Sequence, residues 1–82
     1  MNRREVLLDK ARRSPNGLKF REFERLLQHC GWTQRRQRGS HRIWYSPNGY
    51  RLIIQPDQSM AKGYQVRQFL KQYNQEEADA EE

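Results

Sequence analysis

The stretch from His41 to Ile54, HRIWYSPNGYRLII, restricts the possible folds more than any other part of the chain. Two runs rich in β-branched and aromatic residues flank the tetrapeptide SPNG at residues 46–49. Proline suits the first central position of a turn and glycine tolerates a positive φ, so this tetrapeptide predicts a β-hairpin. The chain is therefore expected to contain antiparallel strands.

Alternation along the first strand of this hairpin predicts two different faces. Successive side chains of a strand point to opposite sides of the sheet. One face is expected to carry His41, Ile43 and Tyr45, and the other Arg42 and Trp44.

Helical patterns lie on both sides of the hairpin. From Phe20 to Cys30 the apolar residues fall near one helix face, and Gly31 follows as a C-terminal cap. Residues 63–73, GYQVRQFLKQY, have apolar residues at i, i+3, i+4 and i+7. Residues 32–38 are polar and basic with weak alternation, which predicts a further strand at the edge of the sheet.

The predicted order is helix, three strands, helix. We therefore expect an α+β fold, α-β-β-β-α, in which the helices cover one face of a three-stranded antiparallel sheet. An extra short helix is expected near the N-terminus, with Asn2 as its N-cap and Glu5 as the capping partner. These patterns divide the chain into three predicted segments. They are an N-terminal helical extension at 1–17, one domain at 18–75, and a disordered acidic tail at 76–82.

Charge is divided unevenly between the domain and the tail. Residues 1–75 hold all 16 Lys and Arg but only five Asp and Glu, a net charge of +11, whereas residues 76–82 contribute −5. Such a basic body favours RNA or another nucleic acid as its partner. No apolar run resembles a signal peptide or a membrane-spanning helix, so a cytoplasmic protein without a membrane partner is expected.

The predicted sheet supplies five candidate residues for binding RNA phosphates. Clustered guanidinium groups beside aromatic rings are a common device of small nucleic-acid-binding domains. These candidates are Arg35, Arg36, Arg38, Arg42 and Arg51. The alternative is a solvated face that only confers solubility.

His41 is the candidate catalytic residue, because imidazole can accept and donate a proton near neutral pH. Spacing alone leaves open whether it acts as a catalyst or as a simple phosphate contact. His29 is interpreted as structural and Cys30 as a core residue. Two histidines and one cysteine form no zinc pattern, and the carboxylates cluster only in the tail, so no metal or other cofactor is expected.

Three segments, FREFERLLQHCGW, RGSHRIWYSPNGYRLIIQP and KGYQVRQFLKQ, resemble the HicA family of toxins from bacterial type II toxin–antitoxin pairs. The resemblance spans residues 18 to about 74, and its most specific motif is Gly39-Ser40-His41 followed by the aromatic Trp44. It implies a fold similar to double-stranded-RNA-binding domains. It also implies mRNA cleavage by His41, with Gly39, Ser40 and Trp44 as motif support, and neutralisation by a HicB antitoxin.

The sequence departs from the family pattern at several positions. Trp44 stands where phenylalanine is usual, and Asp57 stands where many members have a second histidine. Residues 1–17 have no counterpart in the minimal pattern. The resemblance therefore leaves open whether Asp57 contributes to the chemistry.

These residues lead to the hypothesis of a metal-independent endoribonuclease. His41 would deprotonate a ribose 2′-OH, and Arg38 or Arg42 would stabilise the charge that develops on phosphorus. A non-catalytic RNA-binding module would use the same basic sheet, and a protein adaptor without nuclease activity would bind no RNA. Replacement of His41 distinguishes the first two alternatives.

Overall fold

The predicted order of elements is confirmed in the computed structural model, which describes residues 2–81. Helix α1 (Arg3–Arg13), the 3-10 turn η1 (Pro15–Gly17) and helix α2 (Phe20–His29) precede the strands. Strands β1 (Thr33–Arg38), β2 (His41–Tyr45) and β3 (Arg51–Ile54) follow, and then the short strands β4 (Pro56–Asp57) and β5 (Met60–Ala61). Helix α3 (Gly63–Ala80) ends the described chain.

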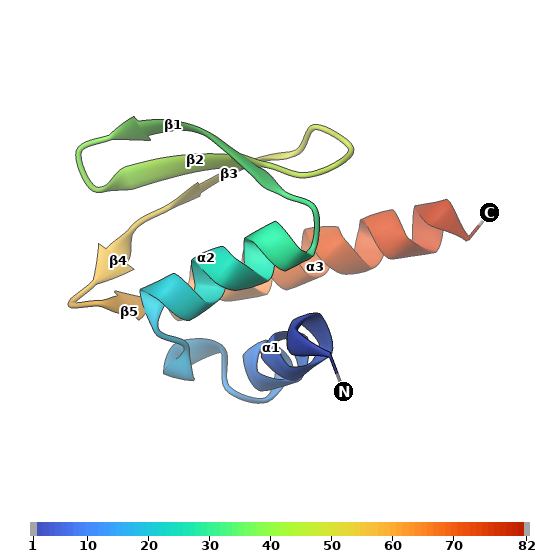
Figure 1. Ribbon diagram of the computed structural model, residues 1–82, viewed down its shortest axis with the longest axis horizontal. Helices are drawn as coiled ribbons and strands as arrows, with labels where there is room; N and C mark the ends of the chain where they lie inside the picture. The colour runs from blue at the N-terminus through green and yellow to red at the C-terminus, as the bar shows by residue number, and fades with distance from the viewer. Residues whose placement is uncertain (1, 82) are drawn as a thin grey trace.

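The first three strands form one antiparallel sheet in the order β1-β2-β3, with β2 at its centre. Ile43 pairs with Ile53 across β2 and β3, and Trp44 pairs with Leu52. Helices α2 and α3 lie beneath one face of this sheet, and α1 lies on the far side of these helices (Figure 1). The predicted α+β fold with helices on one face is therefore confirmed.

The core lies between the sheet and the helices. Strand side chains Trp44, Leu52 and Ile54 are buried there, since alternation sends every second residue toward the helices. Phe69 of α3 lies at its centre, with edge-to-face ring contacts to Phe23 (5.9 Å) and to Trp32 (5.1 Å). Burial of these rings is the main stabilising contribution that holds the helices against the sheet.

Helix α1 packs on the rest of the domain. Its Leu7, Leu8 and Ala11 are buried in the same core cluster as the residues of α2 and α3. The Asn2 side chain accepts a hydrogen bond from the Glu5 N–H at 2.9 Å, as predicted for the N-cap. The first helix is thus part of the packed structure.

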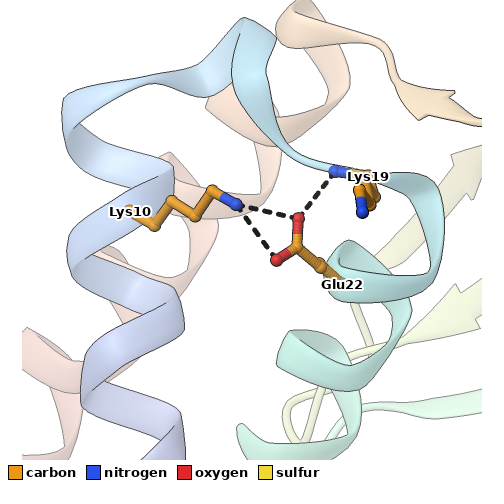
Figure 2. Close-up of polar contacts among 3 residues, drawn as sticks. All are labelled: Lys10, Lys19 and Glu22. Atoms are coloured by element: carbon orange, nitrogen blue, oxygen red, sulfur yellow. Dashed lines mark hydrogen bonds and ion pairs between the residues drawn. The ribbon is translucent and has the colours of Figure 1, made fainter.

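Glu22 connects α1 to the beginning of α2. Its carboxylate accepts a hydrogen bond from the backbone N–H of Lys19 at 2.9 Å, and both of its oxygens lie 3.0 Å from Lys10 Nζ (Figure 2). The Lys19 N–H and the Lys10 ammonium both favour the carboxylate, so the pKa of Glu22 lies below its ordinary value, and the backbone hydrogen bond is the largest cause.

The C-terminal segment differs from its prediction. Helix α3 continues to Ala80, so residues 76–80, predicted to be disordered, are helical. Glutamate and alanine have high helix propensity, and Glu76 accepts hydrogen bonds from the Asn48 N–H (3.3 Å) and from Gln72 Nε2 (2.8 Å). The prediction of disorder rested on the charge of this segment and did not include the hydrogen bond that connects Glu76 to Asn48, at the tip of the β2–β3 hairpin. Glu82, the last residue of that predicted tail, lies outside the described residues.

The segment predicted as a loop between Pro56 and α3 contains the small hairpin β4–β5. Gln58 and Ser59 form its turn with positive φ angles, a conformation that non-glycine residues adopt infrequently. Within residues 2–81, no helix has both the length and the apolar character needed to cross a membrane.

Candidate functional site

The sheet surface opposite the helices carries most of the predicted site. In antiparallel sheets, residues directly opposite each other point to the same side. Register, alternation and the contact of Arg35 with Tyr45 place nine residues on this surface, which we name the open face: Thr33, Arg35, Arg36, Arg38, His41, Ile43, Tyr45, Arg51 and Ile53. No element of residues 2–81 covers it (Figure 1).

His41 lies at one end of the open face, at the start of the central strand. It follows the tight turn at Gly39-Ser40 and pairs in register with Arg38. Gly39 has a φ of +58°, which suits the first central residue of a type II′ hairpin turn. His41 is exposed, so a solvent-borne substrate can reach it, and its register partner Arg38 is exposed as well.

The motif partners of His41 have separate positions. Ser40 is exposed in the turn, whereas Trp44 is buried in the core on the helix side of the sheet. Trp44 therefore supports the strand that carries His41 from beneath. Its indole Nε1 is buried without a hydrogen-bond partner among residues 2–81.

Four arginines of the open face carry uncompensated positive charge. Arg35, Arg36, Arg38 and Arg51 are exposed, and none of them forms an ion pair with a carboxylate of residues 2–81. Arg36 lies opposite Ile43, and Arg51 lies opposite Tyr45. The charges thus flank the central strand from both edges, an arrangement suited to the backbone of a polyanion.

A β-bulge sets the position of Arg35. Gln34 pairs with Trp44 and Arg36 pairs with Ile43, so Arg35 is the extra residue between two consecutive partners on β2. Its guanidinium carbon lies 5.5 Å from the centroid of the Tyr45 ring, within the range of a cation–π contact. Sequence reasoning had no signal for this bulge, although it named Arg35.

Arg42 lies apart from the other four predicted arginines. Its side chain is on the helix side of the sheet, where Nη1 contacts Glu24 Oε1 at 2.7 Å and the guanidinium carbon lies 5.2 Å from the centroid of the Phe20 ring. This side of the sheet is the one that alternation along residues 41–45 predicts for Arg42, opposite to the face that carries His41. The sequence did not indicate the pairing with Glu24, a partner 18 residues away that only the tertiary fold brings near.

A groove borders the Arg42 side chain. It has a volume of about 530 Å³ and is lined by Lys19, Phe20, Arg21, Glu24, Arg42, Pro56 and Ser59. His41 is not among its lining residues. The candidate catalytic histidine is thus exposed outside this groove.

The other reactive side chains lie elsewhere. Burial raises the pKa of the Cys30 thiol to about 11, so the thiol is protonated and a poor nucleophile at neutral pH. Asp57 is exposed on β4 and lines a different groove, with Lys62 and Tyr64. Among residues 2–81, no three His, Cys, Asp or Glu side chains are grouped so that they could hold a metal ion.

The sequence comparison identifies the family. A family model described as HicA toxin of bacterial toxin–antitoxin matches residues 20–74. The chain belongs to the HicA toxin family. No curated protein and no solved structure matches the chain significantly.

Membership of the HicA family gives the protein its general role. It is a toxin of a toxin–antitoxin system, and such a system implies an antitoxin partner. The matched region contains all of the sheet and the Gly39-Ser40-His41 motif, and it excludes helix α1. The additional helix therefore distinguishes this chain from the part that the family model describes.

Proposed function

We propose that this HicA-family toxin is a metal-independent endoribonuclease that cleaves mRNA, with His41 as the general base. The observation that carries the proposal is the position of His41, exposed on the open face and paired in register with an arginine that has no carboxylate partner among residues 2–81. An imidazole beside a free guanidinium can move a proton and neutralise a phosphate at one place.

The proposed reaction is an in-line transfer within the RNA. The neutral imidazole of His41 takes the proton of a ribose 2′-OH, and the 2′-oxygen attacks the adjacent phosphorus. The bond from phosphorus to the 5′-oxygen breaks, and this oxygen acquires a proton from solvent. The products are a 2′,3′-cyclic phosphate and a 5′-OH, with no change of oxidation state.

Arg38 is the better candidate for charge stabilisation at phosphorus. It shares the open face with His41 as a register partner, whereas the Arg42 guanidinium is directed to the opposite side and paired with Glu24. A positive group aimed at the developing charge stabilises the transition state more than the ground state. We therefore assign this role to Arg38 and a structural role to Arg42.

Metal independence rests on the supply of ligands. Hard cations that assist phosphoryl transfer take carboxylate oxygens. Near the sheet, Glu24 is engaged by Arg42, and Glu22 is engaged by Lys10 and the Lys19 N–H. The general base and one positive group together account for modest activity, each contributing about two to four orders of magnitude in rate.

Single-stranded RNA is the substrate form that this chemistry favours. In-line attack requires the 2′-oxygen to align opposite the leaving oxygen, and pairing in an A-form helix restrains the backbone. The exposed sheet also gives room for a strand to lie along β2 with its phosphates near Arg36 and Arg51.

We further propose that a HicB-type antitoxin covers the open face. An acidic surface that contacts Arg36, Arg38 and Arg51 would block the phosphate sites and bury His41. Association driven by these charges should weaken as salt concentration rises. Salt-insensitive binding would place the antitoxin on another surface.

The test is incubation of the purified chain with labelled single-stranded RNA in EDTA, followed by analysis of the product ends. Wild-type protein and His29→Ala are expected to give cyclic-phosphate ends, and His41→Ala is expected to give no cleavage. Cleavage that requires added magnesium, or products with 5′-phosphate ends, would contradict the proposed chemistry.

A non-catalytic RNA-binding module is the second candidate. One observation favours it: among residues 2–81, no side-chain hydrogen bond orients the His41 imidazole, whereas general bases are usually held by a second group. In that case wild-type protein would bind RNA and leave it intact in every buffer.

A further inference from the structure

We infer that the Arg35–Tyr45 pair forms a stacking subsite for one unpaired nucleobase of the RNA. The inference rests on the proposed function, since it assumes that an RNA strand lies along the open face. It adds a specific contact to that function: a base-binding position on the sheet, separate from the position of the cleaved bond.

The first observation is the β-bulge in β1. Without the bulge, strict alternation would put Arg35 and Arg36 on opposite faces of the sheet. The extra residue instead allows Arg36 to pair with Ile43 while the Arg35 guanidinium lies over the Tyr45 ring. Bulges that redirect a side chain are frequent next to functional sites.

The second observation is the geometry of the Arg35–Tyr45 contact itself. Tyr45 is half-buried on the central strand, and the guanidinium carbon of Arg35 lies over its ring, 5.5 Å from the ring centroid. A guanidinium held near an aromatic ring offers a planar surface on which a base can stack. The pair therefore presents a ready-made platform.

The third observation is the apolar strip beside this platform. Ile53 is 40 % exposed and is one of three large hydrophobic side chains exposed within residues 2–81. It lies on the same face as Tyr45 and opposite Ile43, which is buried (6 % exposed), so Ile53 supplies the accessible part of this strip. An apolar strip flanked by Arg36 and Arg51 matches a ligand that has flat apolar bases and a negative backbone.

The subsite lies away from the reacting bond. Tyr45 follows His41 by four residues on the same strand, which corresponds to roughly 13 Å at the rise of a β-strand. A base stacked at Arg35 and Tyr45 thus belongs to a neighbouring nucleotide, not to the one whose 2′-OH faces His41. A paired base has its faces covered by its neighbours in the duplex, so the subsite selects unpaired RNA.

The experiment compares two ligands of equal length and charge. One is a short 2′-O-methyl oligoadenylate, which lacks the 2′-OH and cannot be cleaved, and the other is the same backbone without bases. Affinities for both are measured by fluorescence anisotropy with wild-type protein, Tyr45→Leu and Arg35→Lys. The Arg35→Lys variant keeps the charge and removes the planar group.

Wild-type protein is expected to bind the oligoadenylate about tenfold more tightly than the abasic chain, the scale of one stacked base. In Tyr45→Leu and in Arg35→Lys this preference should shrink to about twofold, with little change in affinity for the abasic chain. Matched controls are Tyr64→Leu, at an exposed tyrosine of α3, and Arg67→Lys on the same helix. Both should keep the wild-type preference.

Four results would overturn the inference. Equal loss of affinity for both ligands would reduce the pair to a phosphate contact. An unchanged base preference together with weaker antitoxin binding would make the strip a protein interface. No binding of either ligand by wild-type protein, with no cleavage of ordinary RNA, would remove the proposed function as well, whereas cleavage without any base preference would remove only the subsite.

Discussion

The two faces of the sheet have the same backbone and different chemistry. On the helix side, Trp44, Leu52 and Ile54 are buried against α2 and α3, and the one predicted arginine on that side, Arg42, is paired with Glu24. On the open face, His41 and four arginines have no carboxylate partner among residues 2–81. Along one strand, therefore, alternate residues stabilise the core and the residues between them form the candidate site on the open face.

This difference teaches how a chain of 82 residues can hold both a fold and a site. Most of the buried apolar side chains lie on the helix side of the sheet, because so small a domain has only one core. The open face carries mainly charged residues, together with Ile43, Tyr45 and Ile53, and lies outside this core. Changes on the two faces should accordingly affect different measurements.

The largest contrast is expected between two adjacent isoleucines of β3. Ile54 is 0 % exposed in the core and Ile53 is 40 % exposed on the open face. Ile54→Ala should lower the free energy of unfolding by about 2 to 5 kcal/mol, because it leaves a cavity. Ile53→Ala should lower it by less than about 1 kcal/mol. Urea denaturation measures both, and equal losses would show that the open face is packed.

The next contrast lies between Arg38 and Arg42. Arg42→Ala leaves the partly buried Glu24 without its partner and should cost about 1 to 2 kcal/mol of stability, with little effect on RNA binding. Arg38→Ala should leave stability nearly unchanged and should reduce the slope of log affinity against log salt by about 0.7, the value for one phosphate contact on a single strand. Denaturation and salt titrations of RNA binding separate the two effects.

A reversed result for this pair would have a clear meaning. If Arg42→Ala reduced the salt slope and Arg38→Ala did not, the RNA would follow the groove beside α2 instead of the open face.

The smallest effect is expected at Glu22, within the packed side of the molecule. Glutamine can still accept the Lys19 N–H, so Glu22→Gln removes the charge but keeps the cap, at a cost of about 0.5 kcal/mol at neutral pH. The pKa of Glu22 is lower in the folded state than in the unfolded state, so its contribution is present above the unfolded pKa.

This contribution is lost as the pH falls through the lowered pKa of folded Glu22, and the variant and the wild type should then converge in stability. Unfolding curves at several acidic pH values measure the convergence, with Glu5→Gln on α1 as a control. If the difference in unfolding free energy between wild type and Glu22→Gln stayed constant down to the lowest pH, the charge of Glu22 would not be the source of its stabilising effect.

Much of this arrangement could be predicted from the sequence, because its signals are local. The spacing of Val66 and Phe69 predicts a helix that packs, and alternation along residues 41–45 predicts the two faces. The turn at residues 46–49 fixes the pairing of β2 with β3. These features depend on residues close together in the chain.

The remaining features depend on contacts between distant residues. The partner of Arg42 is on α2, and the anchor of the last turns of α3 is the hairpin tip at Asn48. The bulge at Arg35 is a detail of the β1–β2 register, which a polar strand with weak alternation does not specify. The sequence therefore indicated the catalytic candidate, the basic residues and the side of the sheet on which Arg42 lies, but not the carboxylate that pairs with Arg42 or the bulge at Arg35.

The central claim is that His41 performs chemistry on an RNA bound by the open face. The most direct test measures, in the same buffer with EDTA, the cleavage rate of a single-stranded RNA and its dissociation constant for wild-type protein and His41→Ala. We expect the rate to fall by at least about a hundredfold, the scale of a lost general base, while the dissociation constant changes by less than about threefold. A variant that cleaves at the wild-type rate, or that loses binding and cleavage in the same proportion, would contradict the assignment of His41 as the base.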